Sequence, residues 1–132
     1  MTSIEVSFPG GKRVSASVRG HRVETDQPAA ASGDDSAPSP FELFLASLAT
    51  CAGFYVLEFC RGRDLPVEGI SLSQVCERDP ESRRISAVKL SIRLPEGFPA
   101  KYRAAVAKAA EACAVRKAIE HPFAFEVSVK AG

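Results

Sequence analysis

The sequence predicts one domain, residues 1–132, of the α+β class with largely antiparallel sheets around long helices. Two observations lead to this expectation. Segments of alternating apolar and polar residues, which are typical of strands, come in two runs, and each run is followed by a segment with helical periodicity, residues 39–62 and 100–120. Strands and helices in separate runs favour α+β over a regular βα alternation. A chain of 132 residues fits a single globular domain.

Three strands are expected before the first helix. Residues 4–8 alternate, the Pro-Gly-Gly sequence at 9–11 interrupts them, and the alternation resumes over residues 13–18, which predicts a hairpin. A further turn leads into a third strand at residues 22–25. The small and polar residues 26–38 cannot form a core of their own, so they are expected to be a loop.

The helix predicted over residues 39–62 has clear signals at both ends. Ser39 is a good N-terminal cap, Pro40 has no N–H to leave unpaired, and Glu42 completes a capping box with Ser39. At the other end, Arg61 is suited to the last carbonyls and Gly62 to a left-handed cap.

Apolar side chains cover most of the circumference of this helix. One stripe contains Phe41, Leu45, Leu48, Ala52, Tyr55, Val56 and Phe59, and the far side carries Leu43, Phe54 and Leu57. A helix that is apolar nearly all round is buried nearly all round. The polar Ser47, Thr50 and Glu58 interrupt the run, which favours a core helix over a membrane span. Because 132 residues offer little to cover such a helix, we expect a second subunit to help.

The second half of the chain predicts a hairpin, a helix and a strand. Residues 67–76 and 85–94 alternate and are separated by a polar turn. Residues 100–120 are rich in alanine and keep helical spacing, and His121-Pro122 ends them. Residues 123–129 then alternate as a closing strand.

Composition excludes several classes of function. With 17 basic and 16 acidic residues, the net charge is +1, which argues against binding to nucleic acid or to a membrane surface. The first ten residues lack a basic region followed by an apolar one, so we expect no export signal and a cytoplasmic location. The four cysteines form no CxxC pair and the two histidines are not spaced as zinc ligands, so neither a metal nor another cofactor is expected.

Three segments together resemble the OsmC-like family, the osmotically inducible and organic hydroperoxide resistance proteins. They are Gly33-Asp34-Asp35 leading into APSPFELFLASLATC, then RGRDLPVEGI, and a second cysteine in the later helix. The resemblance extends over nearly the whole chain in element order. It implies an intertwined homodimer with the cysteine-bearing helices at its centre, and thiol-dependent reduction of organic hydroperoxides.

The resemblance also implies roles for two cysteines. Taken alone, Cys51 is more often a small buried hydrophobe than a reagent. By resemblance, Cys51 is the reacting cysteine and Cys113 the resolving one: a thiolate at Cys51 attacks the peroxide and leaves a sulfenic acid, which the Cys113 thiol converts to a disulfide. Cys76 is expected to be a packing residue. Cys60 would face away from Cys51 on a straight helix and is also expected to be structural.

The chain departs from the family pattern at three positions. Phe41 stands where the hydroperoxide resistance branch has a carboxylate, and the nearest acid, Glu42, lies about 180° around the helix from Cys51. Arg13 follows Gly10-Gly11 and is the candidate cation that lowers the thiol pKa, with an exposed strand arginine as the alternative. Ala114 follows the second cysteine, which leaves open whether the helix breaks there.

The expected function is therefore a thiol peroxidase that acts on small organic hydroperoxides and is restored by a thiol reductant. The apolar residues near Cys51, namely Phe44, Leu48, Phe54 and Tyr55, favour alkyl or aryl peroxides over hydrogen peroxide. The alternative is a ligand-binding protein or thiol redox sensor on the same fold, without fast turnover.

Overall fold

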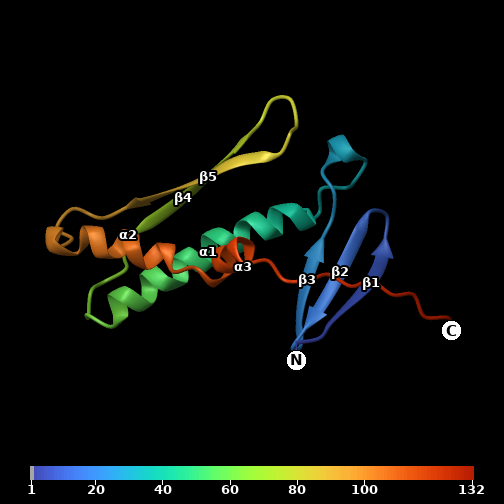
Figure 1. The fold of residues 1–132 in the computed structure, drawn as a ribbon, viewed down its shortest axis with the longest axis horizontal. Helices are drawn as coiled ribbons and strands as arrows, with labels where there is room; N and C mark the ends of the chain where they lie inside the picture. Colours follow the sequence, from blue (N-terminus) through green and yellow to red (C-terminus); the bar gives the residue numbers. More distant parts are fainter. Residues whose placement is uncertain (1) are drawn as a thin grey trace. The chain divides into compact units, whose positions relative to one another are not determined.

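The computed structural model describes residues 2–132, which form two compact units (Figure 1). The first unit extends to Ala46 and the second covers Ser47–Gly132. Helix α1 (Pro40–Arg61) begins in the first unit and continues into the second. The chain is of the expected α+β class, with two small antiparallel sheets and three α-helices among the described residues.

The first unit contains the predicted three-stranded meander. Strands β1 (Ile4–Gly10), β2 (Arg13–Val18) and β3 (His21–Thr25) are antiparallel in the order β1-β2-β3. In the register, Ala16 of the central strand is opposite Val6 on one side and Val23 on the other, so these apolar residues share one face.

A buried carboxylate ties together the loop between β3 and α1. Asp26 is fully buried, and its Oδ2 accepts hydrogen bonds from the N–H and the hydroxyl of Ser36, at 3.0 and 2.5 Å. Its Oδ1 accepts from the N–H of Gln27 at 2.7 Å. The hydroxyl and N–H of Ser36, followed by the N–H of Gln27, lower the pKa of Asp26 to about 2. A Cβ at Gly33 would lie 2.0 Å from the Gln27 carbonyl oxygen, so this close approach requires glycine.

Helix α1 starts with the predicted capping box. The Ser39 N–H donates to Oε1 of Glu42 at 2.9 Å, and the Glu42 N–H donates to Oγ of Ser39 at 3.2 Å. The same contacts lower the pKa of Glu42. At the C-terminal end, the Gly62 N–H bonds the Glu58 carbonyl at 3.0 Å. Both ends of the helix therefore lie where the sequence predicts them, but the left-handed cap expected at Gly62 is wrong, because the positive φ after the helix occurs at Asp64, at 52°.

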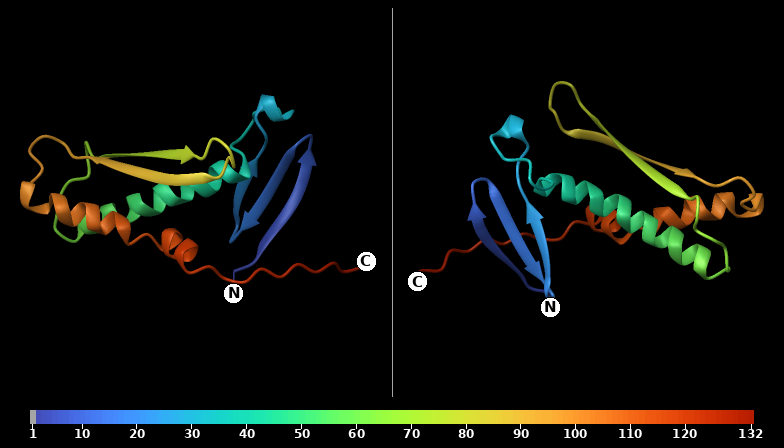
Figure 2. Two further views of the ribbon diagram at one scale, coloured as in Figure 1. Left: turned by 45° about the horizontal axis from the view of Figure 1, so that its top comes forward. Right: turned by 180° about the vertical axis from the view of Figure 1, so that it is seen from behind.

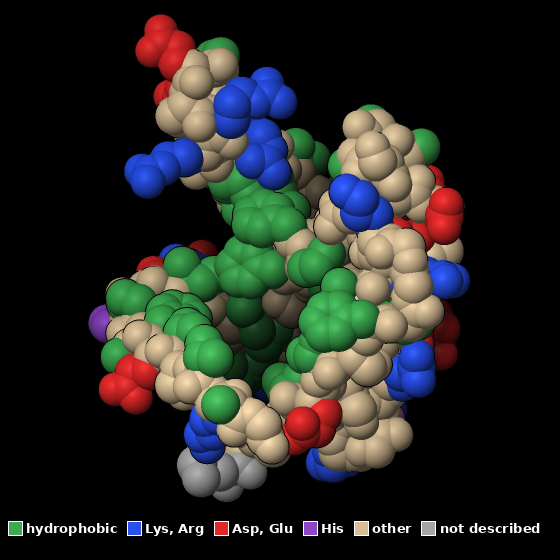
Figure 3. Space-filling model, turned by 90° about the vertical axis from the view of Figure 1, so that its right-hand side faces the viewer, with side chains coloured by type: hydrophobic (Ala, Val, Ile, Leu, Met, Phe, Trp, Pro, Cys, Tyr) green, Lys and Arg blue, Asp and Glu red, His purple; other side chains and the backbone are tan. Residues whose placement is uncertain are grey.

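A single chain buries only one face of α1, so the expected burial on nearly all sides does not occur within one chain. Ala52, Val56 and Cys60 are the buried residues of α1, whereas the Phe54 side chain is 53% exposed. Figure 3 shows hydrophobic side chains at the surface among charged ones. With a mean hydropathy of 1.8, α1 is long and apolar enough to cross a membrane. One such helix is weak evidence for a membrane span, because the core helix of a globular protein meets the same criteria.

The second unit opens with the predicted hairpin, slightly displaced along the chain. Strands β4 (Ser71–Arg78) and β5 (Ile85–Arg93) are antiparallel, with Leu72 opposite Ile92 and Cys76 opposite Val88. The first of these strands starts later than expected, because the Ile70 N–H bonds the Val67 carbonyl and closes a turn there.

The predicted helical segment over residues 100–120 is interrupted at Cys113, the position where the sequence left a break open. A 3-10 turn, η2 (Ala100–Tyr102), leads into α2 (Arg103–Glu111), and α3 (Ala114–Glu120) follows after the break. Cys113 lies in the break with φ −49° and ψ 122°, outside the helical region, and its side chain caps α3. Alanine-rich sequence favours continuity, so the break depends on contacts that Cys113 makes elsewhere in the unit.

The closing strand predicted over residues 123–129 is not present. Residues 122–132 form neither helix nor strand in the described chain. The alternating side chains remain exposed, with Phe125 at 84% and Val127 at 96%. A strand requires a neighbour that completes its hydrogen-bond ladder, which alternation alone does not supply.

The core of the second unit lies between α1, α2 and the β4–β5 hairpin, which run side by side in all three ribbon views (Figures 1 and 2). The buried cluster consists of Ala52, Val56, Cys60, Phe98, Val106 and Ala110. The β4–β5 hairpin lies above α1 in Figure 1. Its residues Leu72, Leu90 and Ile92 pack against the buried cluster. This packing places one face of α1 against the break between α2 and α3.

Candidate active site

Two thiols from distant parts of the sequence meet in the second unit. Cys51 lies in the middle of α1 and is partly buried, whereas Cys113 lies in the break between α2 and α3 and is 2% exposed. Both are free cysteines, and each side chain affects the pKa of the other, as expected of neighbouring thiols. Cys113 follows Cys51 by 62 positions, a separation that gives no indication of proximity, and the family resemblance alone predicts that the two lie close together.

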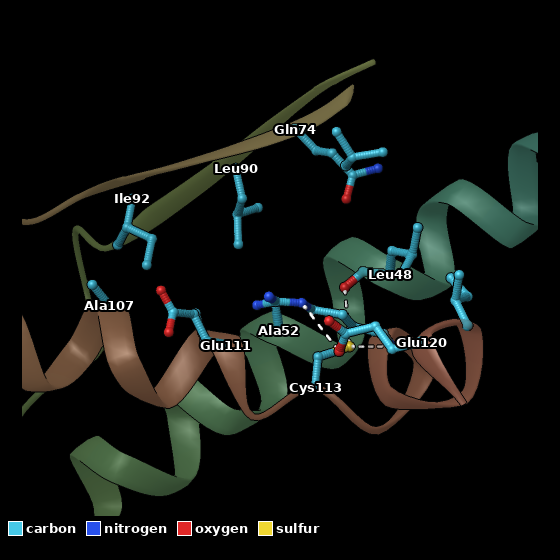
Figure 4. Close-up of a pocket in the computed structure, with 13 residues that line it drawn as sticks. Leu48, Ala52, Gln74, Leu90, Ile92, Ala107, Glu111, Cys113 and Glu120 are labelled. Atoms are coloured by element: carbon cyan, nitrogen blue, oxygen red, sulfur yellow. Dashed lines mark hydrogen bonds and ion pairs between the residues drawn. The ribbon is translucent and has the colours of Figure 1, made fainter. Parts of the chain in front are cut away.

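Backbone groups fix the Cys113 side chain from two sides. Its Sγ lies 3.8 Å from the carbonyl oxygen of Leu48 on α1, to which the S–H donates, and it accepts a hydrogen bond from the Arg116 N–H at 3.4 Å (Figure 4). The second contact makes Cys113 the N-terminal cap of α3. The break in the helix is therefore what allows this sulfur to reach α1.

The environments of the two thiols shift their pKa values in opposite directions. Burial by itself would raise the pKa of Cys51, but the nearby Val115 backbone, the Cys113 side chain and the Ala114 backbone outweigh it, and the pKa is lowered. Burial raises the pKa of Cys113, and its contact with Cys51 raises it further, against the opposing effect of the Arg116 N–H. Of the two thiols, Cys51 therefore ionises more readily than Cys113.

The remaining two cysteines lie apart from this pair. Cys60 is fully buried in the core, and burial raises its pKa, partly offset by the charge of Arg63. Cys76 is on β4, opposite Val88 of β5. A buried thiol with a raised pKa is a poor nucleophile, so the position of Cys60 suits packing.

Arg13, the cation predicted for the site, belongs to the first unit. It begins β2, and its Nε donates to the Gly10 carbonyl at 3.2 Å. Its positive charge also lowers the pKa of Glu24, after the larger effects of hydrogen bonds from Ser15 and Arg22. A contact between Arg13 and Cys51 stays a prediction. Glu42 acts as the cap of α1, as its hydrogen bonds with Ser39 show.

A cavity of about 530 Å³ opens beside the thiol pair in the second unit (Figure 4). Cys113 forms part of its wall, whereas Cys51 does not. Most of the wall is aliphatic, from Leu48, Ala52, Val88, Leu90, Ile92, Ala107, Ala110 and Ile119. Of the four apolar residues expected to surround Cys51 as a pocket, only Leu48 lines this cavity.

Three charged residues and one amide complete the cavity wall. Glu111 comes from α2, Arg116 and Glu120 come from α3, and Gln74 comes from β4. The Arg116 Nε and the Glu120 Oε1 form an ion pair at 3.6 Å. Sequence reasoning missed these residues, because surface charges on a helix carry no sign that they border a cavity. It also missed the Ala114 and Val115 amides, which are invisible in side-chain patterns.

No group of three or more His, Cys, Asp or Glu residues suited to a metal ion occurs within residues 2–132.

Comparisons with known proteins agree on one family. A family model described as OsmC-like protein matches residues 33–128. A solved structure from Psychrobacter arcticus, of a protein named for osmotic stress induction and a detoxification response, is 27% identical, with a TM-score of 0.77 over 92% of this chain and 90% of that one. An OsmC-like protein of Mycoplasma pneumoniae is 10% identical (TM-score 0.71; 92% and 89% covered).

The organic hydroperoxide resistance protein OhrB of Bacillus subtilis is 18% identical, with a TM-score of 0.57 over 92% of each chain. At these low identities, the last two likenesses concern the fold. No curated protein matches the sequence.

Proposed function

Because the chain belongs to the OsmC-like family, we propose that it is a thiol-dependent peroxidase for small organic hydroperoxides. The Cys51 thiolate attacks the terminal peroxide oxygen, the O–O bond breaks, and the alkoxide takes a proton and leaves as an alcohol. The Cys113 thiol then attacks the sulfenic acid of Cys51, which yields a disulfide and water. A thiol reductant restores both cysteines, and no metal or bound cofactor takes part.

The observation that carries this proposal is the position of Cys113, whose Sγ lies 3.8 Å from the carbonyl oxygen of Leu48, three residues before Cys51 on α1. The pKa of Cys51 is lowered and that of Cys113 is raised. The thiolate is the form that attacks a peroxide, and a second thiol nearby can condense with the sulfenic acid that results. The name of the Bacillus subtilis relative, an organic hydroperoxide resistance protein, supports the same substrate class.

The surroundings of Cys51 favour a peroxide that has a carbon skeleton. On α1, Phe54 and Tyr55 follow Cys51 closely and their rings contact each other edge to face. Binding to an apolar surface is stabilised when hydrocarbon is removed from water, and hydrogen peroxide has no hydrocarbon to bury.

Disulfide mapping tests the proposal directly. One equivalent of cumene hydroperoxide is expected to convert the protein to an intrachain Cys51–Cys113 disulfide, with Cys60 and Cys76 left reduced, as read by mass spectrometry of peptides. In Cys113→Ser, Cys51 is expected to stop at sulfenic acid and to reach sulfinic acid with excess peroxide. An unmodified Cys51, or a disulfide that contains Cys60, would contradict the proposed roles.

A second candidate function is a thiol redox sensor or ligand-binding protein on the same fold. Phe41 favours it, since an aromatic ring replaces the carboxylate that the hydroperoxide resistance branch places before the reacting cysteine. Both functions allow the disulfide to form, but only the enzyme turns over repeatedly. Steady-state consumption of cumene hydroperoxide with a dithiol in excess separates them, because a sensor would give one turnover and little more.

Arg13→Ala is expected to raise the apparent pKa of Cys51. A positive charge near a thiol favours the thiolate, so removal of this charge makes deprotonation harder. The measurement is the rate of Cys51 alkylation against pH in Cys60→Ala/Cys76→Ser protein. Arg22→Ala, on the neighbouring strand, is the matched control. An unchanged pH profile would leave Arg13 as a strand residue that bonds the Gly10 carbonyl.

The protein is expected to be a homodimer, because one chain leaves apolar side chains of α1 and of residues 123–129 exposed. Phe54→Asp places a charge on the exposed face of α1 and is expected to give a folded monomer, with an unchanged circular dichroism spectrum and half the mass in light scattering. A wild-type protein that is monomeric at micromolar concentration would contradict this.

A further inference from the structure

We propose that the cavity beside Cys113 admits the reducing thiol, and that this reductant attacks Sγ of Cys113 rather than Sγ of Cys51. The inference rests on the disulfide of the proposed function and adds to it the sulfur at which reduction starts and the charge of the reductant.

The wall of the cavity determines which sulfur a molecule inside it can touch. Cys113 lines the cavity and Cys51 does not, although the two thiols contact each other. A molecule inside the cavity therefore contacts Cys113 and not Cys51. The volume of about 530 Å³ is large enough for a small organic thiol or dithiol, and its aliphatic wall suits a hydrocarbon chain.

The exchange balances as two thiol–disulfide steps. A thiolate of the reductant attacks Sγ of Cys113, the Cys51–Cys113 bond breaks, and Cys51 leaves with the electron pair as a thiolate. A second thiol of the reductant then attacks the reductant's own sulfur in the mixed disulfide, which releases Cys113 as a thiolate that takes a proton. The reductant is oxidised to a disulfide, and both cysteines are reduced.

The environment of the leaving group favours the same direction. Exchange is faster when the departing sulfur is the more stable thiolate. Attack on Cys113 expels Cys51, whose pKa is lowered by the Val115 and Ala114 amides that outweigh burial. Attack on Cys51 would expel Cys113 into a buried position where a thiolate is disfavoured.

The charged part of the wall selects the reductant by charge. Glu111 and Glu120 carry two negative charges and Arg116 one positive charge, and that cation is paired with Glu120. Glu111 has no ion pair among the described residues. The cavity therefore carries a net negative charge, so neutral or cationic thiols are expected to react faster than anionic ones.

Trapping of the first exchange step tests which sulfur is attacked. The disulfide is made with diamide, so the test is independent of the peroxide reaction and its failure is distinct from failure of the proposed function. A short pulse of 2-mercaptoethanol is quenched with iodoacetamide, and peptides are mapped. The expected product has mercaptoethanol on Cys113 and carbamidomethyl on Cys51. The reverse pattern, or an even division, overturns the proposal.

A matched pair of substitutions tests the entry route. Ala107→Phe fills part of the cavity and is expected to slow reduction of the diamide-made disulfide by 2-mercaptoethanol. Ala104→Phe adds the same ring at an exposed position of α2 outside the cavity wall, and is expected to leave that rate unchanged. Equal rates for the two variants overturn the route.

Charged probes test the selectivity. The rate of disulfide reduction is measured for cysteamine, 2-mercaptoethanol and mercaptoacetate in wild type, Glu111→Gln and, as a control, Glu68→Gln in an exposed turn. For each probe, the rate in the variant is divided by the rate in wild type, which removes the effect of the probe's own pKa on its reactivity. In Glu111→Gln, the rate of disulfide reduction is expected to rise about threefold with mercaptoacetate and to fall about threefold with cysteamine at low salt. This is the effect expected from removing one charge at a part-exposed site. Equal ratios for all probes overturn the selectivity.

Discussion

Cys51→Ser is expected to abolish the reduction of cumene hydroperoxide, with a fall in kcat/KM by a factor on the order of 10³ or more, because a hydroxyl cannot replace the thiolate as nucleophile. The measurement is peroxide consumption with a dithiol in excess. Cys113→Ser retains the first turnover, since Cys51 still attacks, but loses steady turnover as the sulfenic acid is oxidised further.

Cys76→Ser is the matched control for these variants, because Cys76 is a partly exposed cysteine on β4 and lies outside the thiol pair. It is expected to keep wild-type turnover. Peroxide consumption that persists in Cys51→Ser would assign the chemistry to another residue and remove the proposed mechanism.

Val56→Asp is expected to unfold the second unit. Val56 is 2% exposed and belongs to the buried cluster between α1, α2 and the β4–β5 hairpin. A carboxylate there has no partner for its charge, and the cost is about 4 kcal/mol or more, a large part of the stability of a small domain. The measurement is the free energy of unfolding from a denaturant titration followed by circular dichroism.

Phe54→Asp is the control for this substitution, since it places the same charge on the same helix, two residues away on an exposed face. The two variants therefore separate folding from assembly. A Val56→Asp protein as stable as wild type would show that the buried cluster does not hold the unit together.

Local signals in the sequence predicted much of the fold. The capping box of Ser39 and Glu42, the Pro-Gly-Gly turn and the alternating hairpins act over a few residues, so the strands of the first unit and both ends of α1 lie where they were expected. These features depend on hydrogen bonds and side-chain faces within one or two elements. The α+β class followed from their order.

Features that depend on distant contacts could not be predicted in the same way. An alanine-rich segment has a high helix propensity, which does not predict a break at Cys113. The break accompanies two hydrogen bonds of the Cys113 sulfur, one to the Leu48 carbonyl and one from the Arg116 N–H. The strand expected at residues 123–129 has the right alternation but no neighbouring strand within the described chain. Nothing in the sequence around Glu111 and Arg116 indicates that these residues line a cavity.

The cap that Cys113 provides for α3 links the reduction potential of the thiol pair to the stability of that helix. In the reduced protein, Sγ of Cys113 donates its proton to the Leu48 carbonyl and accepts the Arg116 N–H. A disulfide has no thiol proton, so its formation deprives Leu48 of a donor, and the oxidised form carries this cost. By thermodynamic linkage the same free energy favours reduction. One weak thiol hydrogen bond at 3.8 Å therefore biases the pair toward the dithiol.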